Sequence, residues 1–229
     1  MKTALITGAG PGLGASLVRR FRKEGLYVAA LARNGARLQE LFDGDPGVTC
    51  IAGDATEPQT VANAVAQIEK IGPLEVAIAN SAGWKIAPLL ELEAQDFETL
   101  WRAGCLTAFN LARAAGPVMA ARGQGTLLFT GSAAQMRAGP GFGAMAVAKT
   151  GLRALSQALA RELGPKGVHV GHVVIDGPIN SARTRAANTN HNRLIDPDGI
   201  AAVFHALHLQ PRLAWSNEID VRTFSDWLA

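Results

Sequence analysis

The sequence predicts an α/β fold, in which a doubly wound, mostly parallel sheet of about seven strands carries helices on both faces. Three observations lead to this prediction. Short aliphatic and β-branched runs alternate with longer segments whose apolar residues recur at helical spacing. The short runs are apolar throughout, as expected of parallel strands that are covered on both faces. The length of 229 residues, with 48% hydrophobic and 18% charged residues, suits a single domain over residues 1–229.

The expected elements follow a strand–helix rhythm along the chain. The first strand is Thr3–Thr7, and the helix at Gly12–Glu24 places Leu13, Leu17 and Phe21 on one face. The later predicted strands are Tyr27–Leu31, Val48–Ile51, Glu75–Ala79, Thr126–Thr130, Val168–Ile175 and Asn217–Val221. The other predicted helices are Ala36–Phe42, Pro58–Ile71, Ala94–Ala121, Ala144–Leu163 and Pro197–Leu209. Alternation of this kind favours a parallel sheet.

The segment Ser181–Asp196 is polar, with three Asn, three Arg and one His. Loops on a rigid scaffold often carry binding residues, and mobile ones close over substrates. We therefore predict a mobile lid at residues 181–196, which favours a small-molecule substrate.

Composition excludes several classes of protein. The two cysteines, Cys50 and Cys105, have no His at metal-ligand spacing, so neither a disulfide scaffold nor a metal site is expected. No apolar run approaches the roughly 18 residues of a membrane span, so no membrane partner is expected. The N-terminal residues reach a glycine-rich turn too soon for a signal peptide, which predicts a cytoplasmic location.

The net charge is only +3, but Arg19, Arg20, Arg22 and Lys23 form one basic cluster. A nucleic-acid partner would require a binding motif beside such a patch, and the sequence contains none. These residues end the helix at Gly12–Glu24, where cations suit the negative end of the helix dipole. We favour this structural interpretation over nucleic-acid binding.

A glycine-rich turn follows the first strand and reads Thr7-Gly8-Ala9-Gly10-Pro11-Gly12-Leu13-Gly14. Glycines let the backbone turn tightly and approach a phosphate, while the next helix offers free N–H groups and a positive dipole. A purely structural turn is the alternative, but the strand–turn–helix context is the one that a dinucleotide site requires. The predicted cofactor-binding residues of this turn are Thr7, Gly8, Gly12, Leu13 and Gly14.

The spacing Gly-x-x-x-Gly-x-Gly, with the motifs below, resembles the classical short-chain dehydrogenase/reductase family, whose fold is Rossmann-type. The resemblance covers nearly the whole chain. It implies that Asp54, in Gly53-Asp54-Ala55-Thr56, meets the adenine ring. Asn80-Ser81-Ala82-Gly83 resembles the Asn-Asn-Ala-Gly motif of that family, which implies that Asn80, Ala82 and Gly83 border the cofactor. In Asp176-Gly177-Pro178-Ile179, which resembles its Pro-Gly turn, Ile179 would contact the nicotinamide carboxamide.

The resemblance also implies the catalytic residues. Lys149 matches the helix lysine of the family, which contacts the nicotinamide ribose, and Ser132, 17 residues earlier, matches its serine. The Tyr-x-x-x-Lys pattern, however, places Met145 where the family has its proton-donating phenol. The single tyrosine, Tyr27, lies in the second predicted strand, and a thioether cannot donate a proton. The catalytic tyrosine is therefore expected to be absent.

A second family residue is expected to be absent as well. Matching Asp96-Phe97 to the start of the long helix places Gly104 at the position of the active-site Asn. Ser132 and Lys149 remain, and the proton would come from water held by one of them or from His191 in the lid. A solvated loop histidine is the alternative interpretation of His191.

The second strand indicates which nicotinamide cofactor binds. NAD enzymes usually end this strand with an acidic residue that accepts hydrogen bonds from the ribose, but here Ala32 stands there and Arg33 follows. A guanidinium can bind a 2′-phosphate through two hydrogen bonds. NADP is therefore expected, in preference to NAD.

Two functions remain open from the sequence. One is an NADP-dependent oxidoreductase that acts on a small carbonyl or alcohol with a non-standard proton donor. The other is a catalytically impaired NADP-binding sensor or scaffold, which the replaced Tyr and Asn would suit. Ser132 and the lid favour the enzyme. The resemblance further implies a homodimer or homotetramer, formed through the helices at Ala94–Ala121 and Ala144–Leu163.

Overall fold

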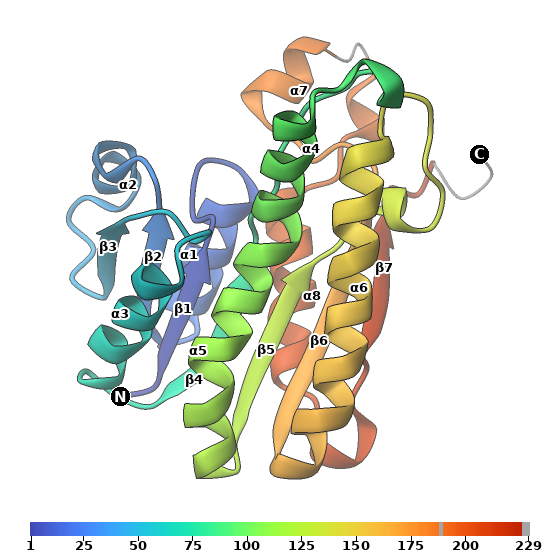
Figure 1. The fold of residues 1–229 in the computed structure, drawn as a ribbon. Helices are drawn as coiled ribbons and strands as arrows, with labels where there is room; N and C mark the ends of the chain where they lie inside the picture. The colour runs from blue at the N-terminus through green and yellow to red at the C-terminus, as the bar shows by residue number, and fades with distance from the viewer. Residues whose placement is uncertain (188–189, 226–229) are drawn as a thin grey trace.

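The computed structural model describes residues 1–187 and 190–225, which build one parallel sheet of seven strands (Figure 1). The strand order is β3-β2-β1-β4-β5-β6-β7. Strands β2 and β3 therefore lie on one side of β1, and the strands from β4 onward lie on its other side. The strands are β1 Thr3–Thr7, β2 Tyr27–Ala32, β3 Val48–Ala52, β4 Leu74–Ala79, β5 Gly125–Thr130, β6 Val168–Asp176 and β7 Glu218–Arg222. All neighbouring pairs are parallel, which confirms the predicted fold class.

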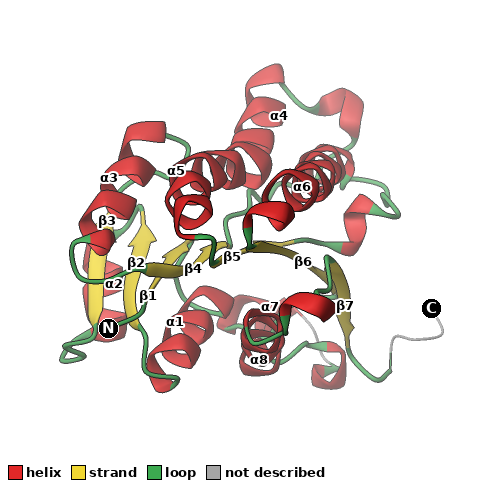
Figure 2. Cartoon of the chain, turned by 90° about the horizontal axis from the view of Figure 1, so that it is seen from below, coloured by secondary structure: helices red, strands yellow, loops and turns green. Residues whose placement is uncertain are grey.

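Helices cover both faces of the sheet (Figure 2). One layer contains α3, α4, α5 and α6, and the other contains α1 and α8. Their bounds are α1 Leu13–Lys23, α2 Gly35–Phe42, α3 Pro58–Glu69, α4 Ala94–Trp101, α5 Thr107–Arg122, α6 Gly143–Leu163, α7 Ala182–Ala187 and α8 Pro197–His208. This arrangement is the doubly wound one that the sequence predicts.

The central strand β1 supplies side chains to both layers, because successive residues of a strand point to opposite faces. Ile6 belongs to the apolar cluster that contains Phe21 of α1 and Phe204 of α8. Leu5 belongs to the opposite cluster, with Leu111 of α5. All five side chains are fully buried. Apolar cores therefore cover both faces of the sheet. Polar sites can form at the ends of the strands, which these cores leave uncovered.

The predicted long helix at Ala94–Ala121 is interrupted. It consists of α4, a π-helical turn at Arg102–Leu106, and α5. Gly104 lies within the π turn, where its low helix propensity lowers the cost of leaving α-helical geometry. Apolar periodicity does not reveal such a turn, since one extra residue shifts the pattern by less than a third of a turn.

The predicted irregular lid is partly helical. Residues 182–187 form α7, and His191–Arg193 form a 3₁₀ turn, while residues 188–189 lie outside the described part of the chain. The end of the segment is attached to the residues after β6, where the N–H of Ile195 donates to the Pro178 carbonyl and the N–H of Asn180 donates to the Ile195 carbonyl. Ile195 is buried at this attachment.

Two residues of the basic cluster at the end of α1, Arg20 and Arg22, form ion pairs within the fold. Arg22 donates to the Asp45 carboxylate at 3.0–3.1 Å and to the Leu26 carbonyl at 2.8 Å. Arg20 pairs with Glu24 at 3.1 Å. These contacts support the structural interpretation of the cluster. No helix within residues 1–187 and 190–225 has the length and hydropathy of a membrane span.

Candidate active site

The glycine-rich turn joins β1 to α1 at the carboxyl edge of the sheet. Gly8 and Gly12 have φ of 73° and 91°, which glycine adopts without strain. A Cβ at Gly8 would lie 2.7 Å from the Asn80 carbonyl oxygen, and a Cβ at Gly14 would lie 2.3 Å from the Gly8 oxygen. Gly10 and Gly12 instead face open space. The turn is thus closed toward the protein and open outward, as a phosphate-binding backbone requires.

Asn80, at the end of β4, binds the neighbouring strand ends together. Its Nδ2 donates to the Gly8 carbonyl at 3.0 Å, and its Oδ1 accepts from the Thr130 hydroxyl at 3.0 Å. Gly83 lets the same loop approach α4, since a Cβ there would lie 2.6 Å from a Leu100 methyl group. These contacts hold the carboxyl ends of β1, β4 and β5 together, where the candidate site lies.

A cleft of ≈ 420 Å³ opens beside this turn, within the usual size range of small-molecule sites. It runs from the ends of β2 and β3 past β1 to β4, and α4 and the π turn form its other wall. Its lining includes the predicted residues Gly8, Arg33, Asp54, Asn80 and Ala82.

At the β2–β3 end of the cleft, Arg33 is exposed, and its side chain has no hydrogen bond or ion pair to any described residue. Asp54 accepts a hydrogen bond from the Thr56 N–H at 2.8 Å, which shapes the turn after β3. Buried Asn110 of α5 donates to the carbonyls of Ala55 and Thr56, both at 3.0 Å. The sequence patterns do not predict this role of Asn110, because its only signal is a polar residue on an apolar helix face.

Ser132 and Lys149 are both anchored at the end of β5. The Nζ of Lys149 donates to the Thr130 carbonyl at 2.6 Å. Ser132 caps a 3₁₀ turn at Ala133–Gln135, where its Oγ accepts from the Ala134 N–H at 3.3 Å. Neither residue lines the ≈ 420 Å³ cleft. They lie farther along the same sheet edge, because β5 follows β4 in the strand order.

Lys149 is a buried cation with 3% of its surface exposed. Burial lowers its pKa to about 8, and nearby Cys105 opposes this shift. Burial also raises the pKa of the Cys105 thiol. At neutral pH, Lys149 therefore holds its proton at Nζ but releases it far more readily than an exposed lysine.

Met145 lies one helical turn before Lys149 on α6 and is half-buried. Gly104 faces the same helix from the π turn, and a Cβ there would lie 3.0 Å from the Ala148 Cβ. A larger residue at Gly104 would push against α6 by a few tenths of an ångström. Glycine permits this close approach of the two helices.

Ile179 follows β6 on the same edge. It is half-buried, forms an isolated bridge with Ile195, and accepts a hydrogen bond from the Thr184 hydroxyl at 2.6 Å. It therefore connects the end of β6 with α7.

Two other predicted residues flank the glycine-rich turn. Leu13 is buried in the first turn of α1, and the Thr7 hydroxyl donates to the Ile78 carbonyl at 3.4 Å.

Comparison with known proteins adds independent information. The profile of a family described as short chain dehydrogenase matches residues 2–192. The D-threitol dehydrogenase of Mycolicibacterium smegmatis is 29% identical over 224 residues, which cover 90% of this chain and 85% of that protein. The crystal structure of a short-chain dehydrogenase from Rhodopseudomonas palustris is 33% identical, with a TM-score of 0.86 over 97% of this chain and 99% of that one.

An alcohol dehydrogenase from the archaeon Thermococcus sibiricus, solved with 5-hydroxy-NADP, is 22% identical and shares the fold, with a TM-score of 0.86 over 98% of this chain and 97% of that one. The profile match spans most of the chain, and the Rhodopseudomonas protein aligns with nearly all of it. This chain belongs to the short-chain dehydrogenase family.

Proposed function

We propose that this protein is an NADP-dependent oxidoreductase that interconverts a small carbonyl compound and its alcohol. The observation that carries the cofactor choice is Arg33, which stands at the cleft without a polar partner among the described residues, while Ala32 offers no carboxylate for a ribose. The NADP analogue bound by the Thermococcus relative supports the same choice.

The residues at the sheet edge fit such a cofactor. The turn Gly8–Gly14 and the start of α1 would hold the pyrophosphate, because the backbone at Gly10 and Gly12 faces open space and the first turn of a helix offers free N–H groups. Arg33 would bind the 2′-phosphate, and Asp54 would meet the adenine. Lys149 and Ile179 would lie at the nicotinamide end. When bound, the cofactor supplies hydride chemistry at its nicotinamide ring.

This chain's own residues would orient the substrate and handle its proton. Ser132 would hold the carbonyl oxygen of a substrate. Lys149 would supply a labile proton from Nζ, whose pKa is about 8. Because Met145 cannot donate a proton, we propose that water held by Lys149 or Ser132 protonates the product. The segment 181–196, which follows β6 at the nicotinamide end, would act as the lid over the substrate.

A non-catalytic NADP-binding sensor or scaffold is the second candidate, and Met145 and Gly104 are the observations that favour it. The two functions separate in one assay, which follows NADPH oxidation over a panel of aldehydes, ketones and diones. If the protein is an oxidoreductase, it should oxidise NADPH with at least one of these substrates, and Ser132→Ala should reduce that rate. Tight NADPH binding without turnover on any substrate would favour the sensor.

Replacement of Arg33 tests the cofactor choice. Arg33→Ala should weaken NADPH binding by about 1–3 kcal/mol, which is roughly 5- to 150-fold in Kd, because a charge-assisted hydrogen bond is lost. NADH binding should hardly change. Arg37→Ala is the matched control, since Arg37 is also exposed but pairs with Glu40 at 2.8 Å. Calorimetry that finds equal losses for both cofactors in Arg33→Ala would contradict the proposal.

The homodimer or homotetramer, the absence of a nucleic-acid partner and the cytoplasmic location stay predictions. Partial exposure of Trp101, Phe109 and Val147 on α4, α5 and α6 supports an interface on these helices. Sedimentation of the purified protein tests that expectation.

A further inference from the structure

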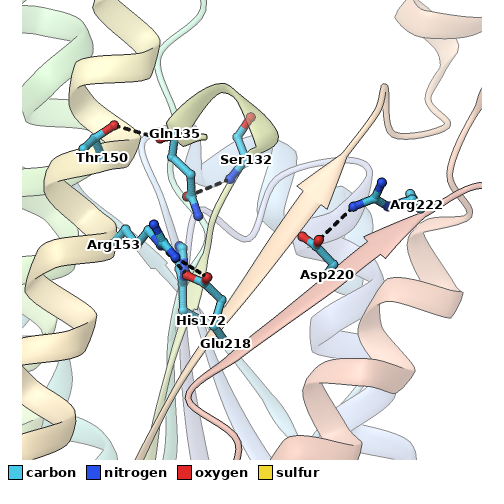
Figure 3. Close-up of polar contacts among 8 residues, drawn as sticks. All are labelled: Ser132, Gln135, Thr150, Arg153, His172, Glu218, Asp220 and Arg222. Atoms are coloured by element: carbon cyan, nitrogen blue, oxygen red, sulfur yellow. Dashed lines mark hydrogen bonds and ion pairs between the residues drawn. The ribbon is translucent and has the colours of Figure 1, made fainter. Parts of the chain in front are cut away.

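A cluster of polar side chains extends from the last strand of the sheet to the turn that carries Ser132 (Figure 3). Arg153 of α6 donates to both carboxylate oxygens of Glu218 on β7, each at 2.7 Å. The Oε2 of Glu218 also lies 3.0 Å from Nδ1 of His172 on β6. The cluster therefore joins a helix and two strands behind the candidate active site.

The protonation of His172 follows from its surroundings. Only 1% of its side chain is exposed, and burial lowers its pKa. The Arg153 guanidinium lowers the pKa of Glu218, so the Glu218 carboxylate is ionised and accepts hydrogen bonds only. Neutral His172 must then carry its proton on Nδ1, which leaves Nε2 as an acceptor.

Two buried atoms in this cluster have no hydrogen-bond partner among the described residues: Nε2 of His172 and Nε2 of Gln135. The Gln135 side chain extends toward His172 (Figure 3). A Cβ at Gly131 would lie 2.4 Å from His172 Nε2 and 3.0 Å from Gln135 Oε1, so these groups are neighbours around Gly131. A buried acceptor and a buried donor that both lack a hydrogen-bond partner reduce the stability of the folded protein. A small movement of the Gln135 amide, or one bridging water, would give both atoms a partner.

Gln135 in turn holds the Ser132 turn. Its Oε1 accepts from the Ser132 N–H at 3.4 Å, which completes a reciprocal cap with the Ser132 side chain. Its backbone carbonyl accepts from the Thr150 hydroxyl of α6 at 3.3 Å. The Gln135 amide therefore has one end on Ser132 and the other facing His172.

We propose that His172, oriented by Glu218 and Arg153, is a positioning residue that fixes Gln135 and, through it, the backbone that aims the Ser132 hydroxyl. The catalytic part of this inference rests on the proposed oxidoreductase function. Gly131 is part of the same arrangement, because any side chain there would displace the His172 imidazole or the turn that carries Ser132.

Kinetics of His172→Phe test the role. The change keeps a buried ring but removes both nitrogens, so kcat should fall about tenfold or more, while the Kd for NADPH stays the same. His169→Phe is the matched control: His169 is equally buried on β6 but stacks on Trp215 at 4.9 Å, away from the Ser132 turn. Its kcat should change less than twofold. An unchanged kcat in folded His172→Phe would overturn the proposal.

A double variant shows whether the effect passes through Ser132. Ser132→Ala/His172→Phe should be no slower than Ser132→Ala alone, because residues that act as one unit are not additive. Further slowing of the double variant would mean that His172 acts by another route. His172→Asn, which keeps a donor for Glu218 but lacks the Nε2 acceptor, should reproduce the kcat loss if His172→Phe does not fold.

Readouts without turnover separate this inference from the proposed function. In NMR spectra, the amide resonance of Ser132 should shift in His172→Phe and stay in place in His169→Phe. Gly131→Ala and His172→Ala should each lower Tm, and together they should lower it by about 3 °C less than the sum, because removing the ring makes room for the new methyl group. An unmoved Ser132 resonance or strictly additive Tm shifts would overturn the inference even if the enzyme is active.

Discussion

Met145→Tyr is expected to raise NADPH-dependent reduction of activated ketones more than tenfold. It places a phenol one helical turn before Lys149, whose ammonium favours the ionised phenol and so lowers its pKa. A phenol with a lowered pKa can protonate the product alcohol in place of water. The gain should stay below the roughly 10²- to 10⁴-fold that a well-placed general acid contributes, because Gly104 has no side chain at the position where the resemblance implies an active-site Asn.

The control is Met145→Phe, which adds the ring without the hydroxyl and should not raise turnover. Adding Gly104→Asn to Met145→Tyr should raise activity further only if the helices can separate, since a Cβ at Gly104 meets the Ala148 Cβ at 3.0 Å. Ala148→Gly is therefore included in the most complete variant. A rate for Met145→Tyr equal to that of Met145→Phe, with NADPH binding intact, would contradict the proton-donor account.

Lys149 should make stability rise with pH. The pKa of Lys149 is about 8 in the folded protein against 10.5 for an unperturbed lysine. Between these values the unfolded chain binds a proton that the folded protein does not bind. The free energy of unfolding should therefore increase by about 1.4 kcal/mol per pH unit, on the order of 3 kcal/mol over the whole interval. Below pH 8 both states are protonated, and the cost of burying the cation is present in full.

Urea unfolding of the cofactor-free protein measures this effect. Lys149→Met removes the titrating group, so the stability of wild type relative to this variant should rise from about pH 8 to about pH 10. Lys166→Met is the control, because Lys166 is exposed in the 3₁₀ turn Gly164–Lys166 that follows α6, and its replacement should leave the pH dependence unchanged. A difference between wild type and Lys149→Met that does not vary with pH would refute the prediction.

The sequence by itself determined the fold class and the glycine-rich turn of the candidate site. Both depend on local patterns: the apolar runs Thr3–Thr7 and Tyr27–Leu31 have the length and composition of buried strands, and the glycines between Gly8 and Gly14 follow the first strand directly. Neighbouring residues encode these features, so a single chain reveals them without knowledge of distant contacts. Met145 is a feature of the same kind, because it stands at a fixed spacing from Lys149.

Only the tertiary structure decided the features that depend on contacts between distant segments. Asn110 binds the turn after Asp54 across more than fifty residues, and His172 approaches Gln135 only because β5 and β6 are neighbours in the sheet. The π turn at Gly104 likewise reflects close packing on α6 and leaves the apolar period almost unchanged. The lowered pKa of Lys149 arises because the packing of α6 on the end of β5 and on the π turn buries its ammonium, and burial is a property of the packed molecule rather than of any short stretch of sequence.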